Sequence, residues 1–118
     1  MKLDYCYEDH HKDEEVARLQ KKMLPEDVAI DCAYLMKSLG DKNRINILYL
    51  LTQIDKICAS EFSDILQISQ PLTSHQLRIL KQMDLIKCSK KGKSVYYSLK
   101  EKTMKPLVET IIKLSDLI

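Results

Sequence analysis

The spacing of apolar residues predicts helices over the first half of the chain. A short helix over residues 13–23 is expected to end at Leu24, and Pro25 suits the first turn of the next helix. On that next helix the apolar side chains recur at the helical period, and they are Val28, Cys32, Leu35, Met36 and Leu39. We therefore expect one buried stripe along this helix, with Cys32 as a core thiol.

A glycine and an aspartate separate this helix from the following one. Gly40 is the expected C′ residue of the first helix, and Asp41 is a suitable N-cap for a helix that runs to about Gln53. The second helix is apolar on most of its sides, through Ile45, Ile47, Leu48, Leu50 and Leu51. A helix with this pattern is expected at the centre of a domain.

Two more helices follow, over residues 59–66 and 70–83, and a short joint at residues 67–70 connects them. A short helix, a tight turn and a longer helix are the parts of a helix-turn-helix. On the longer helix the period turns Thr73, Leu77 and Leu80 inward. It leaves a mostly polar set outside, namely Gln70, Leu72, Ser74, His75, Gln76 and Arg78. Such amide, hydroxyl, imidazole and guanidinium groups bond base edges and phosphates.

The period changes after residue 84. Residues 85–89 and 94–99 read as β-strands on either side of Lys90-Lys91-Gly92-Lys93, which predicts a hairpin whose turn at Gly92 carries three lysines. A last helix, over about residues 103–118, carries a wide apolar stripe made of Met104, Leu107, Val108, Ile111, Ile112 and Leu114. Burial against a second copy is the simplest account of so wide a stripe.

These elements predict a mainly α fold, a winged helix-turn-helix with a two-stranded β-wing. We expect residues 1–24 to form an N-terminal arm with a short helix, and residues 25–118 to form the DNA-binding and dimerisation domain. The dimer would use the helix at Val28–Leu39 and the C-terminal helix, because a chain of 118 residues builds only a thin core. With no long apolar run and an acidic start, the sequence predicts a cytoplasmic protein that does not enter the membrane.

The charge of the chain is small in sum and uneven in distribution. The net charge is +2, but residues 76–105 carry nine Lys and Arg against two acidic side chains, and residues 1–15 carry six acidic side chains against two lysines. Such asymmetry indicates one half that faces nucleic acid. We expect major-groove contacts from Gln70, Thr73, Ser74, His75, Gln76 and Arg78, and phosphate contacts from Lys90, Lys91 and Lys93. Thr73 belongs to this set although its helical position points it inward.

Two other function classes are weighed against DNA binding. A winged helix also serves as a protein-interaction module, but such an adaptor does not need a strongly basic half. An enzyme is not expected, because the sequence has no phosphate-binding glycine loop, no paired catalytic carboxylates and no Cys-His pair with an orienting acid. The sequence therefore favours binding of double-stranded DNA.

Three segments resemble the ArsR/SmtB family of winged-helix repressors. Leu39–Leu48 is similar to the family's acid, arginine and aliphatic helix, Ile68–Leu80 to its recognition helix, and Lys90–Leu99 to its wing. The resemblance runs from about residue 26 to the end of the chain. It implies a homodimer, an operator with two-fold symmetry, and release of DNA when an inducer binds. That inducer is often a thiophilic metal or metalloid, and some branches respond to a non-metal or redox signal.

The resemblance also implies where a metal would bind. A zinc site on the terminal helix is not expected, because Leu99–Met104 contains neither Asp nor His. A second type of site uses a cysteine pair at the start of the helix before the recognition helix, where Cys58 matches the first cysteine and Ser60 replaces the second. The arm adds further candidate ligands, namely Cys6, His10 and His11. This set suits zinc or another thiophilic divalent cation, and no cofactor is otherwise required. The alternative is that Cys58 is an ordinary half-buried thiol and the arm residues are an incidental cluster.

Overall fold

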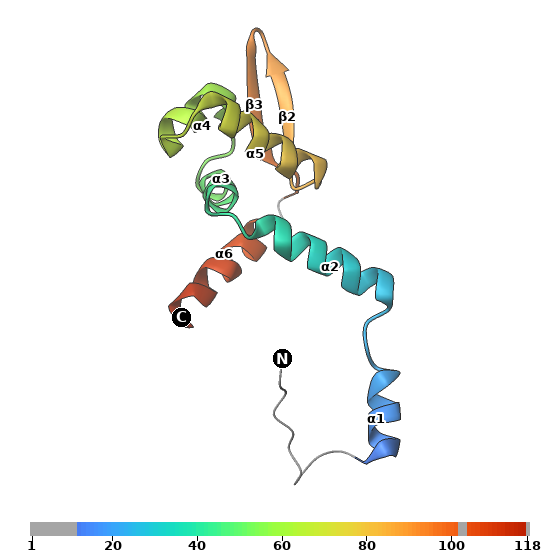
Figure 1. The fold of residues 1–118 in the computed structure, drawn as a ribbon. Coiled ribbons are helices and arrows are strands. Elements are labelled where there is room, and N and C mark those ends of the chain that lie inside the picture. The colour runs from blue at the N-terminus through green and yellow to red at the C-terminus, as the bar shows by residue number, and fades with distance from the viewer. Residues whose placement is uncertain (1–11, 102–103, 118) are drawn as a thin grey trace. The chain divides into compact units, whose positions relative to one another are not determined.

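The computed structural model describes residues 12–101 and 104–117, and it consists of two compact units, Met1–Ala33 and Tyr34–Ile118 (Figure 1). Helix α1 (Asp13–Gln20) belongs to the first unit, and α2 (Glu26–Leu39) begins there and ends in the second. The second unit contains the remaining elements: α3 (Lys42–Gln53), β1 (Ile57–Cys58), α4 (Ala59–Leu66), α5 (Gln70–Gln82), β2 (Ile86–Lys91), β3 (Ser94–Leu99), α6 (Met104–Leu114) and the 3-10 turn η1 (Ser115–Leu117). The predicted winged helix-turn-helix is confirmed.

The sheet has one strand more than the sequence predicts. Its three strands run antiparallel in the order β1-β3-β2, so that β3 lies in the middle. Strand β1 pairs Ile57 with Tyr97 and Cys58 with Tyr96. A strand of two residues is too short to give a period-2 pattern, which is why the sequence shows only a two-stranded wing.

The junction between α2 and α3 is fixed by Asp41. Its carboxylate accepts hydrogen bonds from the backbone N–H groups of Asn43 and Arg44 at 2.9 and 3.1 Å, as expected of an N-cap. Gly40 follows α2 as expected, but its backbone is not left-handed. A side chain there would place a Cβ atom 3.2 Å from the carbonyl oxygen of Lys37, so the close approach of the two backbones favours glycine.

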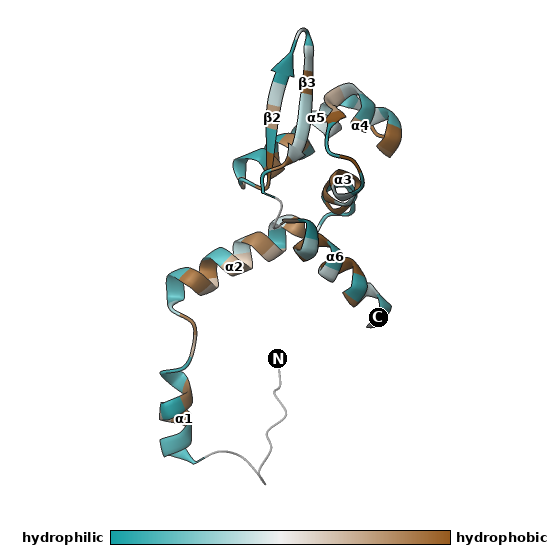
Figure 2. Cartoon of the chain, turned by 180° about the vertical axis from the view of Figure 1, so that it is seen from behind, coloured by the Kyte–Doolittle hydropathy of each residue, from teal (hydrophilic) through white to brown (hydrophobic). Residues whose placement is uncertain are grey.

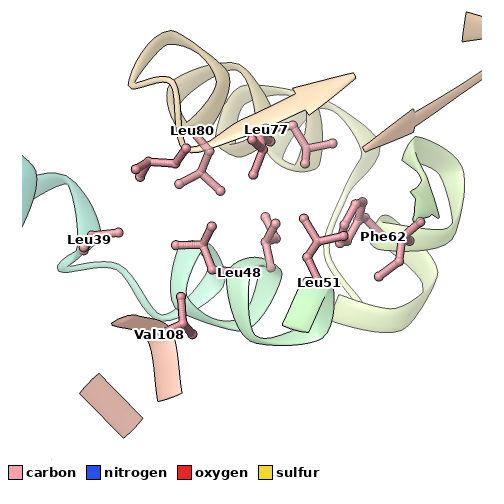
Figure 3. Close-up of a cluster of buried hydrophobic side chains, with 11 residues drawn as sticks. Leu39, Leu48, Leu51, Phe62, Leu77, Leu80 and Val108 are labelled. Carbon is pink, nitrogen blue, oxygen red and sulfur yellow. The ribbon is translucent and has the colours of Figure 1, made fainter. Parts of the chain in front are cut away.

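The core of the second unit is built around α3 (Figure 3). Leu48 and Leu51 of α3 face the side chains of α5, while Phe62 of α4 and Val108 of α6 complete the cluster (Figure 3). The largest fully buried side chains are Phe62, Ile47, Leu48, Leu77, Leu80, Ile86 and Val108. Each contributes about 1.5–3 kcal/mol when it leaves water. The central position expected for this helix is therefore confirmed.

Helices α2 and α6 carry many apolar residues, which are brown in Figure 2. Several of these side chains are exposed within one chain. In α2 only Leu39 is buried, and Cys32 is exposed, so the prediction that Cys32 is a core thiol is wrong for the single chain. In α6 only Val108 is buried; Ile111 and Ile112 pack partly against the core. Leu107 and Leu114 are 41% and 54% exposed. None of the helices in the described ranges is long and apolar enough to cross a membrane.

Removal of the α3 cap tests the role of Asp41 at the junction between α2 and α3. Asp41→Ala should lower the free energy of unfolding by about 1 kcal/mol, because two backbone N–H groups lose their acceptor. Urea unfolding at one fixed protein concentration measures this, with Asp64→Ala on the exposed side of α4 as control. Equal stability of the two variants would show that the cap contributes nothing.

Candidate DNA-binding interface

The turn between α4 and α5 is tight because its backbone groups are paired locally. Gln67 adopts the left-handed conformation (φ 56°, ψ 44°), and the backbone N–H groups of Gln67 and Ile68 both donate to the carbonyl of Ser63. Helix α5 then begins at a serine cap, since the Ser69 hydroxyl accepts from the backbone N–H of Leu72 at 3.2 Å. Pro71 lies in the first turn of α5, where its missing N–H costs no hydrogen bond. Local hydrogen bonds thus fix both the end of α4 and the start of α5.

Helix α5 presents a polar face to solvent. Gln70, Ser74, His75 and Arg78 are exposed, while Leu77 and Leu80 on the other side belong to the core. Leu72 is 38% exposed beside these polar groups. The face therefore offers amide, hydroxyl, imidazole and guanidinium groups together with one apolar side chain, a combination that suits contacts to base edges and phosphates.

Two of the expected DNA contacts are buried instead. Thr73 is 2% exposed, and its hydroxyl donates to the carbonyl of Ser69 at 2.9 Å. Gln76 is 5% exposed, and its Oε1 atom accepts from Nη1 of Arg44 at 2.8 Å. Both positions lie on the inner side of α5 with Leu77, so neither side chain is available to a base. For Thr73 the helical period already predicts an inward position. The polar side chain of Gln76 predicts a place on the outer face, and this prediction is wrong.

The wing is longer and its turn shorter than the sequence predicts. Strand β2 continues through Lys91, which pairs with Ser94, so the turn consists of Gly92 and Lys93. Gly92 has φ +63° and no atom within 4 Å of an added Cβ, so its conformation and not its packing selects glycine. Lys90, Lys91 and Lys93 are all exposed. The hairpin tip stands clear of the helices in both views (Figures 1 and 2).

Charged groups at the base of the wing keep the region positive. A hydrogen bond to the side chain of Cys88 raises the pKa of Lys81 above its ordinary value, at which a lysine is already protonated at neutral pH. Lys100 forms an ion pair with Asp84 at 3.3 Å, with both side chains largely in water. Such an exposed pair adds little stability.

Cys58 occupies the N-cap position of α4 and is half-buried. Its backbone N–H donates to Oε1 of Glu61 at 3.0 Å, and its Sγ lies 3.5 Å from the hydroxyl of Ser60. Hydrogen bonds from the side chain and backbone of Ser60 lower the pKa of the Cys58 thiol, with a further contribution from Ser94. This environment favours the thiolate, the form that binds metals.

The other three candidate metal ligands, Cys6, His10 and His11, lie outside the described residues. Within residues 12–101 and 104–117, no three or more His, Cys, Asp or Glu side chains gather in a way that would hold a metal ion. Cys88 is half-buried in β2. The metal site therefore stays a prediction in which Cys58 is the one described ligand.

Comparison with known proteins identifies the family. A family model described as "Bacterial regulatory protein, arsR family" matches residues 41–87, which include α3, α4 and α5. A cadmium resistance transcriptional regulatory protein (CadC homologue) of Staphylococcus aureus is 34% identical over 109 residues, covering 92% of this chain and 89% of that protein. The chain belongs to the arsR family of bacterial regulatory proteins.

Other relatives agree with this placement. A transcriptional repressor SmtB homologue of Synechocystis is 31% identical over 86 residues, covering 73% of this chain and 64% of that protein. Reduced HlyU from Vibrio cholerae has a similar structure, with TM-score 0.67 and 26% identity over 75% of this chain and 93% of that one. A homodimeric winged helix-turn-helix domain from Mycobacterium bovis shares the fold, with TM-score 0.66 and 20% identity over 91% and 89% of the two chains. Family and fold favour a DNA-binding transcriptional regulator over a protein-interaction module.

Neutralisation of the wing tests its part in DNA binding. Replacement of Lys90, Lys91 and Lys93 by Ala should weaken binding to every duplex and reduce the slope of log affinity against log salt by roughly 0.9 for each lost phosphate contact. Fluorescence anisotropy across a salt series measures the slope. The control is the variant Lys21→Ala/Lys22→Ala/Lys37→Ala, which removes the same amount of charge from α2 and from the segment between α1 and α2. An unchanged slope in the wing variant would mean that the wing does not touch DNA.

Proposed function

We propose that this protein represses transcription as a homodimer that places its two α5 helices in successive major grooves of an operator with two-fold symmetry. The observation that carries the proposal is the exposed polar face of α5 next to a hairpin with three exposed lysines. Base contacts from α5 would give sequence preference, and the wing would anchor the protein to phosphates. Such a regulator acts where the bacterial DNA is, which is the cytoplasm.

The uncovered apolar side chains of α2 and α6 support the dimer. Met36 of α2 is 71% exposed, and Leu107 and Leu114 of α6 are 41% and 54% exposed. A monomer in water gains nothing from such surfaces, whereas a second copy would bury them. The fold neighbour from Mycobacterium bovis is a homodimer. A symmetric dimer also matches the repeated half-sites of a two-fold operator.

Charges placed on α6 test the dimer. Leu107→Glu together with Leu114→Glu should give monomers and weaken DNA binding, because burial of two unpaired carboxylates costs several kcal/mol. These positions are chosen over Ile111 and Ile112, which pack against the chain's own core. Sedimentation velocity measures the mass, and Lys105→Glu/Lys113→Glu on the exposed side of α6 is the control. A dimer that survives the leucine substitutions would exclude α6 from the interface.

For the signal we propose a thiophilic metal ion, zinc or a softer divalent cation, that binds Cys58 of one subunit together with Cys6 and His10 or His11 from the arm of the other subunit. The lowered pKa of the Cys58 thiol supports this, because metals bind the thiolate. The Staphylococcus relative carries cadmium resistance in its name, which favours a thiophilic cation for this branch. Ser60 in place of a second cysteine favours imidazole as the remaining ligand.

The location of Cys58 would allow the metal to act on DNA binding. Cys58 is the N-cap residue of α4, which packs on α5, and as part of β1 it also pairs with Tyr96 of the wing strand β3. A ligand that moves this residue would therefore displace both DNA-contacting elements. Two recognition helices must sit about 34 Å apart to enter successive grooves. A metal that favours the unbound shape by about 1.4 kcal/mol would already lower the DNA affinity tenfold.

Substitution of single cysteines tests the metal signal. Cys58→Ser and Cys6→Ser should each abolish the release of DNA by zinc or cadmium, while Cys32→Ser and Cys88→Ser should retain it. Metal content and DNA affinity with and without the ion are the measurements. If zinc or cadmium still releases DNA from Cys58→Ser as it does from the unaltered protein, the proposal is overturned. Release of DNA by a thiol oxidant alone would favour the redox alternative.

The pH dependence follows from the same thiol. Protons compete with the metal for the sulfur, so metal affinity should fall as the pH is lowered through the pKa of Cys58. Because the hydrogen bonds from Ser60 lower that pKa, the fall should begin at lower pH than for an ordinary thiol. Ser60→Ala should move the onset to higher pH in a competition titration. An onset that does not move would mean that Ser60 has no influence on the ligand.

A further inference from the structure

One partly buried polar contact joins three helices of the second unit. The guanidinium of Arg44, in the first turn of α3, donates from Nε to the carbonyl of Ser38 at 2.6 Å and from Nη1 to Oε1 of Gln76 at 2.8 Å. Ser38 lies in the last turn of α2, and Gln76 lies in the middle of α5. Arg44 therefore connects the end of α2 directly to the helix whose outer face carries the expected DNA contacts.

The guanidinium of Arg44 and its two acceptors, the Ser38 carbonyl and the Gln76 side chain, can bond only in a narrow range of relative orientations. An arginine keeps its charge at all relevant pH values, and its planar fork binds two acceptors in a fixed geometry. The Ser38 carbonyl belongs to the last turn of α2, where carbonyls have no partner within the helix. Gln76 is 5% exposed, so the hydrogen bond to its oxygen is shielded from water. Hydrogen bonds to charged groups are among the stronger ones in proteins.

The remaining contacts between α3 and α5 are of another kind. Leu48 of α3 and Leu77 and Leu80 of α5 form part of the apolar core (Figure 3). Apolar burial decides which side of α5 faces α3, but the hydrophobic effect depends on buried area and has no direction of its own. The Arg44 contact adds a directional hydrogen bond to this packing. Asp41 in turn holds Arg44 in place, through its cap on the backbone N–H of that residue.

We propose that Arg44 is a positioning residue for DNA binding, which sets the orientation of α5 relative to the end of α2 through Ser38 and Gln76. The inference rests on the proposed dimeric DNA-binding function, in which α2 contributes to the interface and α5 enters the groove. Loss of the contact leaves α5 folded and the lysines in place. It allows the two recognition helices to depart from the spacing that two half-sites require, so discrimination between sequences falls while attraction to phosphates persists.

The experiment compares variants of Gln76 in the full chain. The specific probe is a duplex enriched from a random pool by the unaltered protein, and the non-specific probe is a duplex from the unselected pool. Gln76→Leu should lower affinity for the enriched duplex about tenfold, the size expected for one lost hydrogen bond to a charged group, and change affinity for the random duplex far less. Gln76→Glu keeps an acceptor for the guanidinium and should retain the discrimination.

Thr73→Val is the matched control. It removes a buried hydroxyl from the same helix, but that hydroxyl bonds only to Ser69 at the start of α5. If Thr73→Val and Gln76→Leu lose equal stability and equal discrimination, the Arg44 contact is merely structural and the proposal is overturned. It is equally overturned if Gln76→Leu discriminates normally.

A double variant tests whether the two residues act as one unit. Arg44→Leu with Gln76→Leu should cost little more discrimination than Arg44→Leu alone, because the first substitution already removes the contact. Fully additive losses would contradict the proposal. Failure of the unaltered protein to enrich any sequence would overturn the proposed function and the role of Arg44 together, whereas normal enrichment by Gln76→Leu would overturn only the latter.

Discussion

The burial of α3 is the constraint on which the rest of the second unit depends. Ile47 and Leu48 are almost completely buried, and α5, α6 and the sheet all pack against the helix that carries them. Because α5, the wing strand β3 and α6 all pack against α3, the positions of these three elements depend on one supporting helix. The polar groups of α5 face outward because Leu77 and Leu80 must face α3.

This support is small, and its size has consequences for assembly. A chain of 118 residues cannot cover the apolar sides of all its helices, and α2 and α6 retain exposed Met and Leu side chains. The same limit places α6, whose exposed leucines are proposed to meet a second copy, and α5, whose polar face is proposed to contact DNA, against the same helix α3. A change at the α6 surface would therefore have to pass through only that one helix to reach α5.

Much of this arrangement could be predicted from the sequence, since the signals are local. Asp41 and Ser69 are caps by residue type and position, and the periods of α3 and α5 are readable over several turns. The failures have a common cause in contacts between distant residues. Gln76 is buried because Arg44, 32 positions away, supplies its partner. Strand β1 exists because β3 pairs with it. Cys32 is exposed because, of the residues of α2, only Leu39 is buried in the core and only Leu35 packs partly against it.

The uneven length of the strands gives the wing two mechanical regions. Strand β1 pairs with Tyr96 and Tyr97, so three strands lie side by side at the middle of the hairpin, while the part near Gly92 has two strands. A two-stranded ribbon is marginally stable and twists easily, whereas a third strand stiffens it. The lysines at the tip are thus carried on the more flexible, two-stranded end of the hairpin. If the wing contacts DNA as proposed, such a tip would be able to follow the local curvature of the backbone without disturbing the helices of the second unit.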